Sequence, residues 1–79
     1  MAQAGIKEIR VVSSNIKTAA YDLGTKTMIL TFINRPQWKY SYFHVPPRVW
    51  TKFVQAESKG KYFADYIKDQ YAYTRKNIR

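Results

Sequence analysis

A stretch of alternating side chains from Gln37 to Pro46 constrains the fold of this chain more than any other part of the sequence. Successive side chains of a β-strand point to opposite faces, so a strand here would place Trp38, Tyr40 and Tyr42 on one face and Lys39 on the other. Three large rings in a row either fill a hydrophobic core or form a platform on which flat ligands such as nucleobases stack. The pattern leaves both interpretations open.

The size and composition of the chain predict one folded domain. Its 79 residues suffice for a single modest core, and the 46% hydrophobic and 16% aromatic fractions are far above those of disordered chains. Cysteine is absent, which excludes disulfides, thiolate zinc sites and thiol catalysis. The sequence shows neither an apolar run of membrane-spanning length nor a secretion signal, which favours a cytoplasmic location and no membrane partner.

Positive charge is concentrated in the second half of the chain. The net charge is +9, and residues 35–79 hold ten basic against three acidic residues. A field of this sign attracts polyanions, most often nucleic acid, through the release of condensed counterions. Surplus lysine also serves solubility in small intracellular proteins, so charge alone does not identify a partner.

Short segments before the aromatic stretch predict further strands. Residues 6–12 suit a short strand or an extended lead-in, and residues 16–21 and 27–33 suit the two strands of a hairpin. We expect Gly24 to take a positive φ in the turn at residues 22–25. Strands joined by short connections are usually neighbours, so these segments predict an antiparallel meander of three or four strands.

After His44 the hydrophobic spacing changes from two residues to that of a helix. Pro46 and Pro47 suit the first turn of a helix over residues 48–56, because the missing amide hydrogen has no partner there anyway. Ser58 is the expected N-cap of a second helix over residues 61–71, after a break at residues 57–60. We therefore predict an α+β fold, in which the meander is followed by two C-terminal helices packed on one face.

A series of short motifs resembles the KTSC domain, a small domain named for its occurrence at the C-terminus of some lysyl-tRNA synthetases and also found alone in bacteria and phages. The series is Val12-Ser13-Ser14-Asn15-Ile16, Tyr21-Asp22, Phe32, Tyr40-Ser41-Tyr42, Val45-Pro46, Ser58-Lys59-Gly60-Lys61-Tyr62-Phe63 and Ile67. One departure is Arg35-Pro36-Gln37, where similar proteins often carry a glycine.

The resemblance implies a domain over residues 11–73, which follows a flexible N-terminus or short strand at residues 1–10 and precedes a basic tail at residues 74–79. It also implies RNA binding, through the association with a tRNA ligase. We expect a structural part for five of the motif residues, which are Tyr40, Tyr42, Val45, Pro46 and Phe63.

Nucleic-acid binding requires cations for phosphates and flat side chains for bases, and this chain interleaves the two. If the rings of the central strand face the helices, the binding face must instead use rings and cations from the helices and the C-terminal end, and we favour this arrangement. Gly60 either admits a phosphate to the backbone or simply makes a tight connection between the helices. The candidate residues, for RNA more than for DNA, are Lys39, Lys52, Lys59, Gly60, Lys61, Tyr62, Tyr66, Tyr73, Arg75 and Lys76.

Other function classes receive less support from the sequence. His44 has no nearby carboxylate or cysteine, so we expect a turn residue, no catalytic or metal site, and neither a cofactor nor a small-molecule substrate. Asp65 and Asp69 are expected to form solvated ion pairs with the lysines Lys61 and Lys68. The alternative to nucleic-acid binding is a basic adaptor, such as one encoded by a phage, that docks on an acidic surface of a host or viral protein.

Overall fold

The elements follow one another in the order that the sequence patterns predict, with one strand added at the end. The computed structural model describes residues 6–11, 13 and 15–78. The elements are β1 (Ile6–Arg10), β2 (Ile16–Asp22), β3 (Thr27–Phe32), β4 (Arg35–Tyr42), α1 (Pro47–Gln55), α2 (Lys59–Tyr66) and β5 (Tyr73–Asn77). The α+β class and the meander followed by two helices are confirmed, and the sheet has five strands in place of the predicted three or four.

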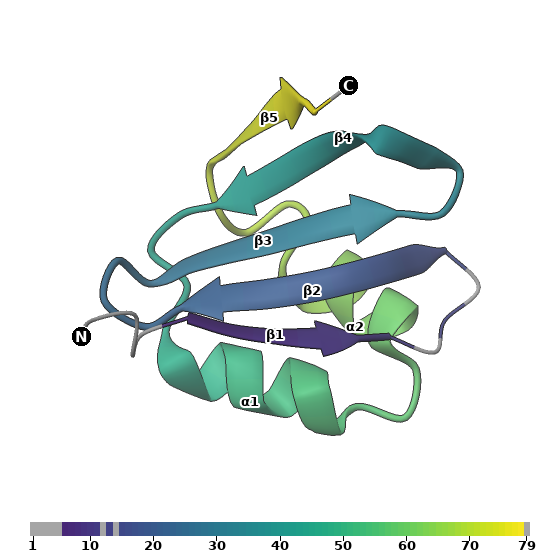
Figure 1. Cartoon of the computed structure of the whole chain (residues 1–79). Coiled ribbons are helices and arrows are strands. Elements are labelled where there is room, and N and C mark those ends of the chain that lie inside the picture. The colour runs from purple at the N-terminus through teal and green to yellow at the C-terminus, as the bar shows by residue number, and fades with distance from the viewer. Residues whose placement is uncertain (1–5, 12, 14, 79) are drawn as a thin grey trace.

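All neighbouring strands of the sheet are antiparallel, in the order β1-β2-β3-β4-β5 (Figure 1). The expected lead-in at residues 6–10 is β1, while residues 1–5 of the predicted flexible N-terminus lie outside the described residues. Residues 73–77, most of which we expected as a basic tail, form β5 at the edge of the sheet. Every side chain of β5 is exposed. A half-buried strand is predicted from alternating apolar and polar residues, and residues 73–77 do not show that alternation.

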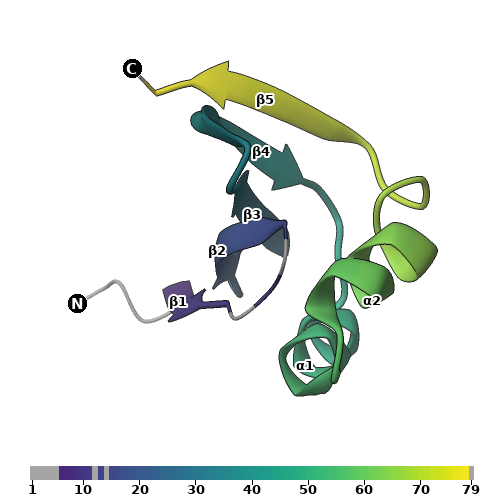
Figure 2. The ribbon, with the colours of Figure 1, turned by 90° about the vertical axis from the view of Figure 1, so that its right-hand side faces the viewer.

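Both helices pack against the same face of the sheet, here called the inner face (Figure 2). Cross-strand pairing sets Tyr21, Met28 and Tyr42 side by side on this face, and all three are buried. From α1, Trp50 and Phe53 complete the core, and the Trp50 ring stacks on Tyr21 at a centroid distance of 5.4 Å. The core therefore lies between the helices and the central strands β2, β3 and β4.

The capping residues of both helices match their sequence signals, but α2 begins at Lys59, inside the predicted break at residues 57–60, and ends earlier than expected. Pro46 and Pro47 occupy the N-cap and first position of α1, and the Ser58 hydroxyl caps α2 by accepting from the Lys61 amide. We expected the second helix to reach residue 71, but α2 ends at Tyr66. The next two amides both donate to the Phe63 carbonyl, which closes the helix and turns the chain towards β5.

The turns use a different residue for positive φ from the one the sequence suggests. No described glycine has a positive φ, so the expectation for Gly24 is wrong; Lys26, at the end of the same turn, has φ 58°. The turn is held instead by the Asp22 carboxylate, which accepts from the backbone amides of Gly24 and Thr25. His44, expected as a turn residue, also has φ 58° and leads from β4 towards α1.

Candidate nucleic-acid interface

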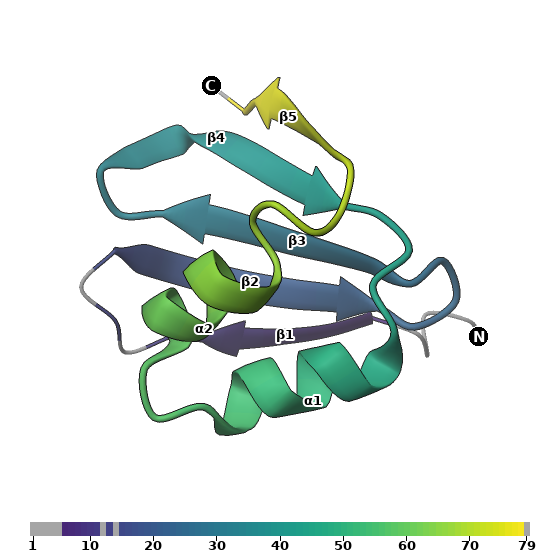
Figure 3. The ribbon, with the colours of Figure 1, turned by 180° about the vertical axis from the view of Figure 1, so that it is seen from behind.

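The sheet extends further than the helices that cover it, so part of the inner face stays open. In Figure 3 α2 lies over the β1 and β2 part of the sheet and α1 runs alongside β1, while β4 and β5 continue beyond the helices. The rings along β4 and β5 record this change: Tyr42 is 3% exposed, Tyr40 and Trp38 are half-buried, and Tyr73 is 51% exposed. The aromatic strand thus takes part in the core at one end and in an open surface at the other.

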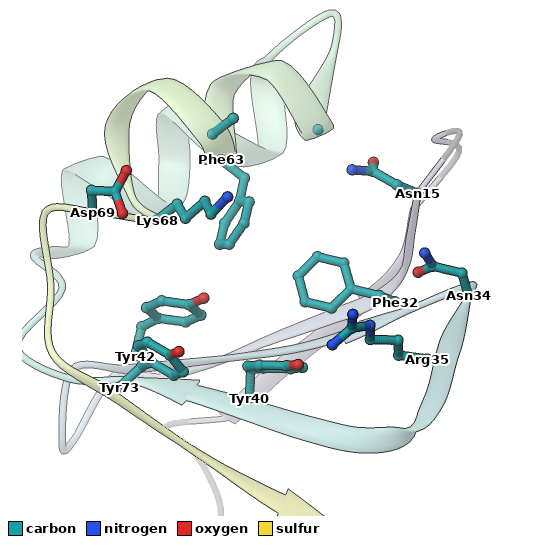
Figure 4. Close-up of a pocket in the computed structure, with 12 residues that line it drawn as sticks. Asn15, Phe32, Asn34, Arg35, Tyr40, Tyr42, Phe63, Lys68, Asp69 and Tyr73 are labelled. Carbon is teal, nitrogen blue, oxygen red and sulfur yellow. The ribbon is translucent and has the colours of Figure 1, made fainter.

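A cavity of about 380 Å³ lies between this open surface and α2 (Figure 4). We call it the aromatic hollow. Five rings line it, from β3, β4, α2 and β5: Phe32, Tyr40, Tyr42, Phe63 and Tyr73. Polar side chains line it as well, namely Asn15, Asn34, Arg35, Lys68 and Asp69. Figure 4 shows the three tyrosines on the sheet side, with Phe63, Lys68 and Asp69 on the opposite side of the opening.

Contacts between the rings give the hollow a firm lining. Tyr73 stacks on Tyr42 with centroids 5.1 Å apart and also contacts Tyr40 at 5.9 Å. Phe32 meets Tyr40 edge to face at 5.3 Å and Phe63 at 5.5 Å. Such pairs contribute about 0.5–1.5 kcal/mol beyond the burial of their area. The exposed rings are therefore held in place by buried ones.

Arg75 extends this surface along β5. Its guanidinium carbon lies 4.3 Å from the centroid of the Trp38 ring, a cation–π contact on the inner face. The contact holds the cation close to the sheet, next to the tyrosines of the hollow. Among the described residues that line the hollow, Arg35 and Lys68 are basic and Asp69 is acidic, and Arg75 adds a cation beside them.

Burial changes the acidity of one ring in the hollow. It raises the pKa of Tyr42 to about 12, and the neighbouring Tyr73, Tyr40 and Asp69 add to the rise. A tyrosine of ordinary pKa is already protonated at physiological pH, so the rise keeps the phenol protonated into alkaline solution as well. No negative charge from this ring repels an anion at the hollow.

The structure separates the predicted site residues into several groups. Of these residues, Gly60 and Tyr73 line the hollow, and Arg75 lies beside it. Lys39 and Lys76 lie directly opposite each other in the β4–β5 ladder, but on the outer face of the sheet, which the helices do not cover. Lys52 is exposed on α1.

The predicted residues at the start of α2 take part in local structure. Lys59 Nζ donates to the Ala56 carbonyl at the end of α1, 3.1 Å away. Lys61 forms an ion pair with Asp65 at 2.9 Å, and this contact raises the Lys61 pKa. A methyl group on Gly60 would lie 2.5 Å from the Asn15 side-chain oxygen, so glycine here permits a close approach between α2 and the loop before β2.

Tyr62 and Tyr66 form a separate aromatic pair on the outer side of α2. Their ring centroids are 4.7 Å apart, Tyr66 is 58% exposed, and burial raises the pKa of Tyr62. A shallow depression beside the pair is lined by Ser58, Lys61 and Asp65 among others. Within this depression, Asp65 balances the charge of Lys61.

The motif residues lie mostly in the core. Tyr42, Val45 and Phe63 are buried, while Tyr40 and Pro46 are half-buried. Of the two expected ion pairs, the structure contains the one between Lys61 and Asp65. Among the described residues, no salt bridge joins Asp69 to a lysine. Within that same part of the chain, no three potential metal ligands cluster, and no helix has the length and apolar character needed to cross a membrane.

Sequence reasoning did not assign several residues of the hollow to the site. These are Phe32, Asn34 and Arg35, which lie together at the β3–β4 connection, and Lys68 and Asp69, which reach the hollow only when α2 packs over the sheet. The departure at Arg35-Pro36-Gln37 bears on the turn type, and the structure places Arg35 at the start of β4. The pairing of β5 had no signal in the sequence.

Comparisons with known proteins agree on the domain type. The family model described as the KTSC domain matches residues 12–71. Among solved structures, the crystal structure of a KTSC domain protein from Yersinia pestis is 30% identical, with a TM-score of 0.82; the match covers 91% of this chain and 99% of that one. A search of curated proteins finds no match. The family match includes the hollow from Asn15 to Asp69 and ends before β5.

Proposed function

This chain belongs to the KTSC domain family, and from that premise we propose that it is a small, non-enzymatic nucleic-acid-binding module that acts in the cytoplasm. RNA is the preferred ligand, as the occurrence of the family in lysyl-tRNA synthetases implies. The module binds through the open inner face of β4 and β5. Its cations contact phosphates, and its exposed rings contact bases.

One observation carries this proposal: a half-exposed tyrosine, Tyr73, lies on a strand whose next inner-face side chain is Arg75. Stacking of a base on an aromatic side chain contributes about 1–3 kcal/mol and tolerates any base. A cation one step along the same strand face is placed to contact the neighbouring phosphate. Rings and cations on one face are the combination that single-stranded nucleic acids require.

The charge distribution supports the same surface. Arg35 and Lys68 line the hollow and Arg75 lies beside it. At the start of α2, by contrast, Asp65 balances Lys61, and Lys59 donates to the Ala56 carbonyl. Lys39 and Lys76 lie on the outer face, where they can contact phosphates of a strand that passes around the β5 edge. Their direct opposition costs stability, since like charges on facing strand positions repel.

A titration of fluorescent single-stranded RNA and DNA at two salt concentrations tests the proposal. We expect binding that weakens steeply as salt rises, because each neutralised phosphate releases counterions. The RNA should bind more tightly than DNA of the same sequence. If neither nucleic acid binds even at low salt, the proposal is wrong, and a basic adaptor that docks on an acidic protein becomes the better explanation.

A further inference from the structure

The aromatic hollow has walls of an unusual kind for a small domain. Five of its twelve lining residues are aromatic, and none is leucine, isoleucine, valine or methionine. An aliphatic ligand would find no branched aliphatic side chains to pack against. A flat aromatic ligand can stack on the faces of the lining rings or contact their edges. We propose that the hollow binds one unpaired nucleobase of a single-stranded chain, an inference that rests on the function proposed above.

The size of the hollow fits a single base with its sugar. Ligand cavities generally measure about 300–1,000 Å³, and the hollow, at about 380 Å³, lies at the lower end of that range. In a duplex, neighbouring bases cover both faces of each base and its partner occupies the pairing edge. Only an unpaired base can therefore enter the hollow. The ligand is therefore a single strand, a loop or a bulge.

The polar lining supplies both kinds of hydrogen-bonding group that a base edge needs. Asn15 accepts from the Ser13 hydroxyl through its side-chain oxygen, at 2.9 Å, and Figure 4 shows its amide nitrogen turned towards the hollow. Across the opening, Asp69 presents a carboxylate as an acceptor. Such a pair orients a base without requiring one identity.

Two cations at opposite ends of the hollow are placed for the phosphates on either side of the base. Arg35 comes from the start of β4 and Lys68 from the turn after α2. In Figure 4 they stand on different sides of the opening, with the rings between them. A chain that enters past one cation and leaves past the other would deliver its base to the rings.

The test compares two RNA oligomers that are abasic at every position but one, where the first oligomer carries a base and the second is abasic as well. The two chains have the same phosphates, and the second has no base that can stack. We expect the base-free chain to bind about 5- to 150-fold more weakly, the equivalent of one stacked base, with a similar salt dependence. Equal binding of both chains would overturn the base site and leave phosphate binding intact. Failure of both chains to bind would overturn the proposed function itself.

Two matched tyrosines place the base within the molecule. Tyr73→Ala removes an exposed ring from the hollow, and Tyr66→Ala removes an equally exposed ring from the outer side of α2. The first change should abolish the difference between the two oligomers, and the second should preserve it. If circular dichroism shows that Tyr73→Ala weakens the fold, Ala64→Leu replaces it in the same comparison of the two oligomers. Ala64 is exposed and lines the hollow, so a larger side chain there should also abolish the difference. An unchanged difference in a folded Tyr73→Ala or Ala64→Leu variant would overturn the assignment.

Nucleoside monophosphates distinguish a chain from a free nucleotide as the ligand. Each monophosphate should bind at least about tenfold more weakly than the oligomer, because it lacks the second phosphate contact. A monophosphate that binds as tightly as the oligomer would overturn the chain as the ligand.

Discussion

Tyr42 and Tyr73 lie directly opposite each other in the β4–β5 ladder and stack with ring centroids 5.1 Å apart, yet Tyr42 is 3% exposed and Tyr73 is 51% exposed. One stack thus joins the core to the open surface. The buried ring holds the exposed ring in position, so a ligand that stacks on Tyr73 does not have to order a mobile side chain. The exposed side of the hollow is thus joined to the core through this stack.

The stability of the fold should depend on Tyr42 at alkaline pH. Burial raises its pKa to about 12 from the ordinary value of 10.0, so the folded state resists losing the proton. The resulting stabilisation is complete below pH 10 and is lost as pH rises from 10 to 12. Urea midpoints at intervals from pH 9 to pH 12 should fall more steeply for the natural chain than for Tyr42→Phe. Parallel curves would show that Tyr42 has no part in the effect.

Removal of one buried hydroxyl should destabilise the domain. The Tyr21 hydroxyl donates to the carbonyl oxygen of Val45, and both residues are fully or almost fully buried. Tyr21→Phe leaves that carbonyl without its donor, which we expect to cost about 1–3 kcal/mol of the free energy of unfolding. Tyr66→Phe, a loss of the same hydroxyl at an exposed position, should change it by less than about 0.5 kcal/mol. Chemical denaturation of both variants measures the difference, and similar values would contradict the account.

Gly60 should respond to alanine in opposite ways, depending on what stands at residue 15. In the natural chain the new methyl group would lie 2.5 Å from the Asn15 oxygen, which the Ser13 hydroxyl holds in place. The exposed Asn15 side chain can move away at the cost of its hydrogen bond, so we expect Gly60→Ala to lower the free energy of unfolding by up to about 1 kcal/mol.

With Asn15→Gly already present, the obstructing oxygen is gone. Alanine is the better helix former, so the same change should then raise the free energy of unfolding by up to about 1 kcal/mol relative to Asn15→Gly alone. Thermal unfolding of the natural chain, the two single variants and the double variant completes this double-mutant cycle. A destabilising Gly60→Ala in both backgrounds would show that the conflict lies elsewhere.

The turn between β2 and β3 should accept a glycine at its end more readily than at its centre. Lys26 has φ 58°, where glycine is free of strain, and its side chain is exposed, so Lys26→Gly should stabilise the fold by up to about 1 kcal/mol. Gly24 does not have a positive φ, and a methyl group there meets Asp22 at an ordinary 3.4 Å. Gly24→Ala should therefore be neutral or stabilise slightly. Melting temperatures in the reverse order would place the positive φ at Gly24.

Local signals predicted local structure well in this chain. The proline pair at residues 46 and 47 and the serine at residue 58 mark helix starts because a cap depends on a few adjacent residues. The residue that takes positive φ in a turn depends on the register of the strands on either side. The sequence pattern at Gly24 could not reveal that register.

The site depended on contacts that no local pattern encodes. Tyr73 reaches Tyr42 across a strand pair that is separated in the sequence by both helices. The residues of β5 are mostly polar and show no hydrophobic alternation. The segment is a strand because its backbone pairs with β4. The pattern at residues 38–42 identified the aromatic face, but whether each ring is buried depends on how far the helices extend over it.

The central claim is that nucleic acid binds at the hollow and not wherever positive charge is present. Arg35→Glu with Lys68→Glu reverses both cations that line it. The control variant, Lys7→Glu with Lys17→Glu, makes the same change in net charge on β1 and β2, towards the opposite edge of the sheet from β5.

The most direct measurement is the affinity of one single-stranded RNA for these two variants across a range of salt concentrations. We predict that the hollow variant binds at least about tenfold more weakly than the control variant and shows a smaller dependence of log K on log salt. Equal losses of affinity and equal salt dependences in the two variants would contradict the account.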